Sequence, residues 1–228
     1  MTSDYNDKIA IIVAGGSGKR MASQIPKQFL PINNLPIIFH TIKKFQQASC
    51  SIILVLPKEH INTFENLAQE YDFNLQNILI SEGGNERYDS VKNGLSKINS
   101  DFKGNVAVHD AVRPLINSEK ITKLFKICED KKAVIPVVKL KDSIRQLSGE
   151  KSRHVNREDF VIVQTPQIFE FSILKKAYSS EIPTQTTDDA GLVERIGQEI
   201  FLAEGDFQNL KITTPEDLDL AEVLIKKI

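Results

Sequence analysis

The chain is poor in cysteine and lacks tryptophan: 228 residues contain two cysteines and no tryptophan. Cys50 and Cys128 form no C-x-x-C pair and match no metal-binding spacing, which argues against a disulfide framework and favours a reducing compartment. Residues 1–8 are polar and partly acidic, unlike a signal peptide, and no apolar run approaches the length of a membrane span. We therefore expect a cytoplasmic protein that binds no membrane.

The chain also lacks an excess of charge of either sign. It has 29 Lys and Arg residues and 30 Asp and Glu residues, which gives a formal net charge of −1. Such a chain has no global positive field for nucleic acid or an anionic membrane surface. Any cations that bind a ligand must therefore be local. With 41% hydrophobic residues, the chain is long enough for one domain, residues 1–228, with a substantial core.

The most informative segment is a glycine-rich turn after an apolar run. Residues 9–13 are apolar, and Ala14-Gly15-Gly16-Ser17-Gly18 follows directly. Glycines let backbone N–H groups approach a ligand closely, and successive N–H groups can form an anion-binding concavity. Arg20 and Lys27 add full positive charge nearby. This combination predicts a polyphosphate site to which Ala14, Gly15, Gly16 and Gly18 contribute.

Two common phosphate loops do not fit this segment. In a Walker A loop, Gly18-Lys19 would be followed by Ser or Thr rather than Arg20, and a glycine would replace Val13. In the dinucleotide fingerprint, glycine would replace Met21. The segment instead resembles the signature loop of the sugar-nucleotide pyrophosphorylases, A-x-G-x-G-x-R-M followed by P-K-Q, here Pro26-Lys27-Gln28. An ordinary glycine turn with solvated charges is the alternative.

Apolar runs alternate with helical patterns along the chain, which is typical of an α/β fold. We expect a Rossmann-like, mostly parallel sheet with helices on both faces. Ser118 and Thr214 are the expected N-caps of two of these helices. Strands are predicted at residues 9–13, 51–56, 77–81, 106–109, 133–138, 200–203 and 210–212, and helices at 36–47, 59–71, 87–98, 118–128, 171–178, 188–196 and 215–226.

Residues 139–160 break this alternation. They are charged, carry Ser148-Gly149-Glu150 at their centre, and show weak alternation on either side. This pattern predicts a β-hairpin arm that projects from the domain. A long hairpin is only marginally stable alone in water, so it needs a partner surface. A second subunit is the simplest partner, and we therefore expect a homodimer.

Other polar residues follow the predicted strands, where open α/β sheets bind their ligands. The Asn85 amide can complement the donors and acceptors of cytosine, although a helix N-cap is an equal alternative. Asp110 can hold Mg²⁺ together with substrate phosphates, and Arg113 can bind a phosphate, although a surface ion pair would use the same two residues. A lysine at the end of an apolar strand, Lys211, favours a functional role, whereas we interpret His109 as a packing residue.

The motifs, taken in this order, closely resemble the 2-C-methyl-D-erythritol 4-phosphate cytidylyltransferase family over nearly the whole chain. The resemblance implies that the phosphate of methylerythritol phosphate attacks the α-phosphorus of CTP and releases pyrophosphate, in the non-mevalonate isoprenoid pathway. It also implies Mg²⁺ as the cofactor. The matching segments are residues 14–21, 26–28, 83–90, 109–114, 142–143, 164–167, 187–190 and 209–213.

The resemblance further implies roles on the nucleotide side. Arg20, Lys27 and Lys211 would stabilise the pentacoordinate phosphorus and the leaving pyrophosphate. The cytosine would be recognised by Gly84, Asn85 and Ser90.

On the acceptor side, the resemblance places Asp110 beside the Mg²⁺ and the substrate, and Arg113 beside the substrate. Ser143 and Arg157 of the arm, together with Thr187, would hold methylerythritol phosphate. The arm residues would come from the other subunit, which agrees with the hairpin's need for a partner.

Some residues depart from the family pattern. Asn85 stands where the family often has Asp, and Ser143 replaces a common Thr. Ala14-Gly15-Gly16 stands where many members have Ala-Ala-Gly, and this form is common in the related ribitol 5-phosphate cytidylyltransferases. Ribitol phosphate or another sugar phosphate is therefore the alternative acceptor, although residues 187–191 favour methylerythritol phosphate.

A protein of a different class, a non-catalytic nucleotide-binding module, is a third hypothesis. It predicts that the cations of the phosphate site are missing. Arg20, Lys27 and Lys211 are all present, which argues against it.

Overall fold

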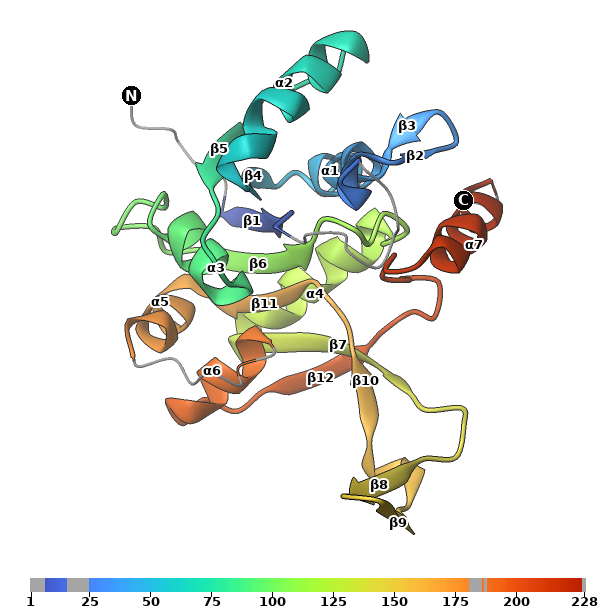
Figure 1. Cartoon of the computed structure of the whole chain (residues 1–228). Coiled ribbons are helices and arrows are strands. Elements are labelled where there is room, and N and C mark those ends of the chain that lie inside the picture. Colours follow the sequence, from blue (N-terminus) through green and yellow to red (C-terminus); the bar gives the residue numbers. More distant parts are fainter. Residues whose placement is uncertain (1–6, 16–24, 181–185, 187, 227–228) are drawn as a thin grey trace.

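The computed structural model describes residues 7–15, 25–180, 186 and 188–226. An eight-stranded sheet forms its centre, in the order β10-β7-β11-β6-β1-β4-β5, and β12 also pairs with β7 (Figure 1). The pairs among β6, β1, β4 and β5 are parallel, as is β12 with β7, whereas β10 and β11 pair antiparallel with their neighbours. The sheet contains β1 (Lys8–Val13), β4 (Ser51–Leu56), β5 (Ile78–Glu82), β6 (Asn105–Asp110), β7 (Ala133–Lys139), β10 (Val161–Val163), β11 (Gln167–Glu170) and β12 (Phe201–Glu204).

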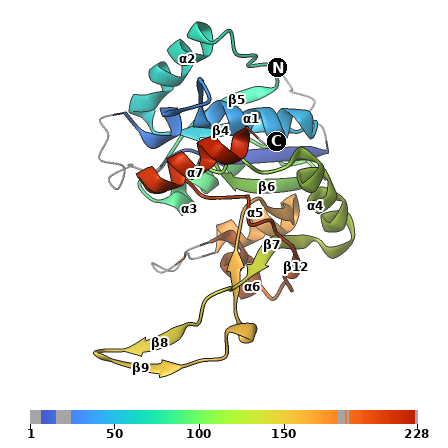
Figure 2. The same cartoon turned by 90° about the vertical axis from the view of Figure 1, so that its right-hand side faces the viewer.

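Helices cover both faces of this sheet, as the sequence predicts (Figures 1 and 2). Ile9 and Ile11 of β1 belong to a core cluster with α3 (Arg87–Leu95), α5 (Phe171–Ser179) and α6 (Asp189–Arg195). Ala10 and Ile12 belong to the cluster on the opposite face, with α1 (Ile37–Gln47), α2 (Ile61–Glu70) and α4 (Ser118–Lys131). Because side chains alternate between the faces, a sheet covered on both sides requires apolar residues along the whole strand.

A smaller cluster holds the last helix, α7 (Pro215–Ile225), against the short pair β2 (Pro31–Ile32) and β3 (Leu35–Pro36). Ile32, Ile212 and Ala221 are fully buried in it. The predicted N-cap of α7 is confirmed, because the Thr214 side chain accepts a hydrogen bond from the Asp217 amide and Pro215 occupies the first turn. This cluster fixes the segment that carries Lys211.

The predicted hairpin is present as β8 (Arg145–Ser148) and β9 (Lys151–His154), which pair antiparallel and extend away from the sheet (Figure 2). Gly149 at its tip has a φ of 58°, a conformation that glycine adopts without strain. Every residue of both strands is exposed. None of the helices in the described part of the chain has the length and apolar character that a bilayer crossing requires.

Three local predictions were wrong. Asn117 rather than Ser118 caps α4. The alternative interpretation of Asn85 as a helix N-cap does not hold either, because Glu86 is the cap residue of α3. Residues 210–212 are not a strand, although the Ile212 amide bonds to the Val112 carbonyl at 2.9 Å. The helix predicted from residue 59 begins as a 3-10 turn, η3 (Lys58–His60), before α2. The antiparallel strands β10 and β11 were not anticipated by the sequence patterns.

Candidate active site

A cavity of about 260 Å³ opens beyond the carboxyl ends of β1 and β6. The glycine-rich turn, the loop before α3, the end of β6 and the segment before α7 all line it. The motifs that the sequence places after separate strands therefore converge, as predicted. The predicted site residues among its lining are Ala14, Gly15, Lys27, Gly84, Asn85, Ser90, Asp110 and Lys211.

The phosphate-loop side of this cavity is tied to the core. The Gln28 amide donates to the Ala14 carbonyl at 2.9 Å, and the buried Lys27 ammonium donates to the Ile212 carbonyl at 3.3 Å. Lys27 is therefore anchored to the segment that carries Lys211, although the two lysines lie far apart in the sequence. Gly16, Gly18 and Arg20, also predicted for this loop, lie outside the described residues.

The loop before α3 is preorganised by Ser90. Its buried hydroxyl accepts a hydrogen bond from the Gly84 amide at 3.1 Å and donates to the Glu86 carbonyl at 3.2 Å. A Cβ on Gly84 would lie 2.2 Å from the Cβ of Asp89, so only glycine fits there. Asn85 lines the cavity next to this fixed turn. Ser90 thus shapes the loop through its own hydrogen bonds within the protein.

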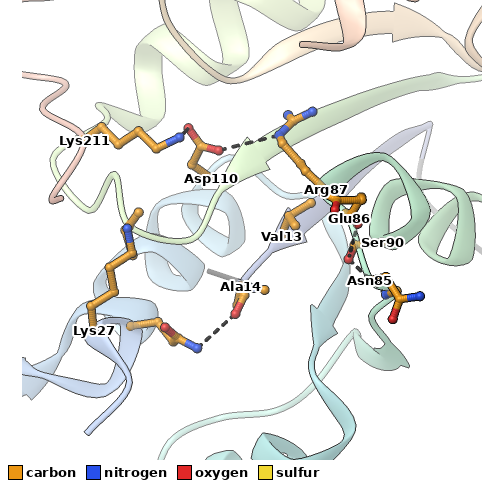
Figure 3. A pocket seen from close by; sticks show the side chains of 13 residues that line it. Val13, Ala14, Lys27, Asn85, Glu86, Arg87, Ser90, Asp110 and Lys211 are labelled. Atoms are coloured by element: carbon orange, nitrogen blue, oxygen red, sulfur yellow. Dashed lines mark hydrogen bonds and ion pairs between the residues drawn. The ribbon is translucent and has the colours of Figure 1, made fainter. Parts of the chain in front are cut away.

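Three cations surround the carboxylate of Asp110, the last residue of β6. Its Oδ2 lies 3.1 Å from the Lys211 Nζ and 3.0 Å from the Arg113 Nε, and its Oδ1 lies 3.9 Å from the Arg87 Nε. Figure 3 shows Lys211 and Arg87 reaching Asp110 from opposite sides. Burial alone would raise the pKa of Asp110, but these positive charges outweigh it and hold the pKa well below its usual range. The carboxylate is therefore ionised at neutral pH.

His109 is a structural residue, as interpreted from the sequence. It is fully buried, and burial lowers its pKa to about 3, so the imidazole is neutral. Its Nδ1 lies 3.1 Å from the Thr165 hydroxyl, which also accepts a hydrogen bond from the Asp110 amide at 3.2 Å. The pair therefore fixes the backbone that carries the Asp110 carboxylate.

A second hollow, of about 310 Å³, adjoins the first. It shares Arg87, Asp110 and Lys211 with the first cavity. Arg113 also lines it, donating to Asp110 and, at 2.9 Å, to the Asn209 carbonyl. The remaining lining comes from the end of β10, the link to β11, the start of β11 and the N-cap of α6: Val163, Gln164, Thr165, Gln167 and Asp188.

Two predicted acceptor residues do not line this hollow. Ser143 and Arg157 are exposed on the arm and line neither hollow of the single chain. Arg157 instead donates to the Lys141 carbonyl at 2.6 Å. Thr187 lies outside the described residues.

The sequence interpretation missed Arg87 and its partner Asp189. The Arg87 guanidinium donates to both carboxylate oxygens of the fully buried Asp189, at 3.0 and 2.6 Å. One signal was available, because an arginine at the start of a helix opposes the helix dipole and so needs another reason to be there.

Comparison with known proteins decides the family. The family model for 2-C-methyl-D-erythritol 4-phosphate cytidylyltransferase matches residues 8–227. The chain belongs to this family. A relative of this name from Bacteroides thetaiotaomicron is 44% identical over 217 residues, which cover 94% of this chain and 98% of the relative. One from Clostridium perfringens is 40% identical over 226 residues, 96% of this chain and 98% of the relative.

Solved structures agree with this cytidylyltransferase assignment. The 2-C-methyl-D-erythritol 4-phosphate cytidylyltransferase of Francisella tularensis has a TM-score of 0.80 at 28% identity, with 96% of this chain and 99% of that chain covered. The 4-diphosphocytidyl-2C-methyl-D-erythritol synthase of Anaerococcus prevotii has a TM-score of 0.80 at 27% identity, with 96% and 98% covered. These names support methylerythritol phosphate over the ribitol phosphate alternative.

Proposed function

We propose that this chain transfers CMP from CTP to 2-C-methyl-D-erythritol 4-phosphate, with the nucleotide in the first cavity and the acceptor in the second hollow. The observation that carries this proposal is the wall that the two hollows share, made of Arg87, Asp110 and Lys211. Two anionic substrates on either side of this wall would meet there, beside the positive charges of Arg87 and Lys211. A cytoplasmic location and the organisation of residues 1–228 as one domain stay predictions.

The chemistry needs charge neutralisation and alignment more than it needs a base. The nucleophile is a phosphate oxyanion, so no proton has to be removed before it attacks the α-phosphorus. Catalysis of such a transfer rests on positioning and on cations placed where negative charge grows. Lys211 and the anchored Lys27 occupy suitable places, and we assign Arg20 to the same task. Pyrophosphate leaves as the new phosphoanhydride bond forms.

The residues at Asp110 fit a magnesium ion that is shared with the nucleotide. The described residues contain no group of three or more His, Cys, Asp or Glu side chains that could hold a metal. Mg²⁺ commonly binds through one or two carboxylates plus substrate phosphates, and Asp110 supplies one carboxylate in the cavity. Asp110 would hold the ion, which when bound offsets the charge of the triphosphate.

We assign cytosine recognition to the Gly84–Asn85 turn. Replacing Asn85 by leucine removes the donor and acceptor but keeps the approximate size. Because a hydrogen bond to a neutral partner contributes roughly 1 kcal/mol, we expect the KM for CTP to rise about 5- to 10-fold with little change in kcat. Steady-state kinetics with CTP and UTP measure this. Asn62→Leu, at an exposed position of α2, is the matched control, and an unchanged CTP KM in Asn85→Leu would refute the assignment.

We also assign the uncovered edge of the sheet to a second copy of this chain. The strand β10 exposes Val161, Ile162 and Val163, and Phe160 precedes it. The strand β12, which pairs with the other side of β7, exposes Phe201 and Leu202. A contiguous exposed apolar run such as residues 160–163 marks an association surface. A partner seated here would bring the arm residues Ser143 and Arg157 to a site other than their own.

Product analysis tests the proposed activity. Purified chain is incubated with Mg²⁺-CTP and either methylerythritol 4-phosphate or ribitol 5-phosphate, and pyrophosphate release is followed. We expect turnover with the first acceptor. Turnover with ribitol phosphate alone would keep the nucleotide site but overturn the acceptor. Tight CTP binding without pyrophosphate from either acceptor would favour a binding module.

A further inference from the structure

The buried carboxylate of Asp189 is the centre of a hydrogen-bonded cluster that joins Arg87 of the shared wall to residues with no role assigned so far. It is fully buried and receives both Arg87 bonds, and the Tyr178 hydroxyl donates to it at 2.5 Å. A buried carboxylate without partners is strongly destabilising. These hydrogen-bond donors therefore offset the cost of burying the Asp189 charge. Burial and the Asp189 charge raise the pKa of Tyr178, so its hydroxyl keeps the proton that it donates.

Arg87 connects this cluster to the nucleotide cavity. It is the first residue of α3 and directly follows the Gly84–Glu86 turn that lines that cavity. The turn is rigid, because the Glu86 and Asp89 side chains each bond to the other's backbone amide and Ser90 bonds to Gly84. A change in the position of this turn on nucleotide binding would therefore move the Arg87 guanidinium.

Asp189 connects the same cluster to the acceptor side. It begins α6, and its amide and that of Ala190 both donate to the Gln167 Oε1, at 3.1 and 2.9 Å. The Gln167 amide in turn donates to Asp188 at 3.0 Å. Gln167 and Asp188 line the second hollow but not the first. A continuous set of polar contacts thus joins a wall of the acceptor hollow to the nucleotide turn.

We propose that Arg87, Asp189 and Tyr178 are positioning residues that couple the two sites, so that nucleotide bound at the Gly84–Glu86 turn fixes the Gln167 and Asp188 wall for the acceptor. The proposal rests on the proposed function, since it takes the second hollow as the acceptor site. Arginine is suited to this task, because its planar guanidinium binds a carboxylate with two parallel bonds. Lysine cannot do this with one ammonium group.

Hydrogen–deuterium exchange with α,β-methylene-CTP tests the coupling without an acceptor. In the wild-type chain the nucleotide should slow exchange at residues 82–95 and also at residues 188–195, although the latter do not line its cavity. In Arg87→Lys, protection of 82–95 should persist and protection of 188–195 should be lost. Protection confined to residues 82–95 in the wild type would overturn the coupling. So would protection of residues 188–195 that is unchanged in Arg87→Lys. No protection at either segment would overturn the proposed function and, with it, the coupling.

Tyr178→Phe provides a milder variant that keeps the buried ring. We expect the KM for the acceptor to rise at least about fivefold, the lower end of typical coupling between sites, while the KM for CTP stays unchanged. Tyr71→Phe removes the same hydroxyl from the C-cap of α2, a residue that lines neither hollow, and should change neither constant. Equal changes in both KM values, or none, in Tyr178→Phe would contradict a positioning role.

Discussion

Replacing Lys211 by methionine is expected to lower kcat by about 10²- to 10³-fold, the loss seen when one preorganised charge-stabilising group is removed. Lys211 lines both hollows, and its ammonium lies 3.1 Å from the Asp110 carboxylate. In the proposed arrangement it therefore lies where the attacking phosphate and the α-phosphate would meet. Methionine keeps the length of the side chain but removes the charge. Because the charge matters most in the transition state, kcat should fall far more than the affinity for CTP.

Lys123→Met is the matched control, because it removes a lysine charge from the exposed surface of α4. It should leave kcat unchanged. Rapid-quench measurement of one turnover separates the chemical step from product release in each variant. A Lys211→Met enzyme whose single-turnover rate stays within a few-fold of the wild type would show that this cation does not stabilise the transferred phosphoryl group.

Replacing Ile162 by aspartate is expected to convert the proposed dimer into a monomer and to remove most of its turnover. Ile162 lies in the middle of β10, is 50% exposed, and sits between other exposed apolar residues. A charge buried at the centre of an apolar interface costs at least about 2 kcal/mol of association free energy. The monomer would lose the partner's arm. Loss of the charge-assisted hydrogen bonds of Arg157 corresponds to a fall of roughly 10- to 100-fold in kcat/KM for the acceptor. Nucleotide binding should persist.

Leu79→Asp is the control for this variant. Leu79 is 41% exposed on β5, the strand at the opposite edge of the sheet, so the same change should leave the dimer intact. Sedimentation, isothermal titration with CTP and turnover are measured for both variants. Mixing Arg157→Gln with Lys211→Met should restore part of the activity, because a mixed dimer would contain one intact site. An Ile162→Asp monomer with wild-type turnover would contradict the shared site.

The sequence predicts the parts of this molecule whose cause is local. The strand β1 is predicted from its own apolar residues. The phosphate site is predicted from the glycines and cations that follow this strand in the sequence. Asp110 and Lys211 are predicted as site residues because open α/β sheets bind their ligands beyond the carboxyl ends of the strands. The helix start near residue 118 was misplaced by one position, since Asn117 and Ser118 are both good N-caps and only the folded backbone decides between them.

Contacts between distant segments could not be read in this way. The Arg87 and Asp189 pair spans 102 positions, and Thr165 reaches His109 across 56. The strands β10 and β11 have three and four residues, too short for periodicity to show, and they exist because β6 and β7 pair with them. Residues 210–212 alternate like a strand but find no such pairing partner, so they stay irregular.

The central claim is that the acceptor phosphate attacks CTP directly at the wall that the two hollows share. Isotope transfer tests this claim most directly. Methylerythritol 4-phosphate carrying ¹⁸O in its three non-ester phosphate oxygens is converted with unlabelled Mg²⁺-CTP, and the masses of both products are measured. We expect all of the label in the diphosphocytidyl product and none in pyrophosphate. Label in the released pyrophosphate, or a product that lacks the acceptor's oxygens, would contradict the account.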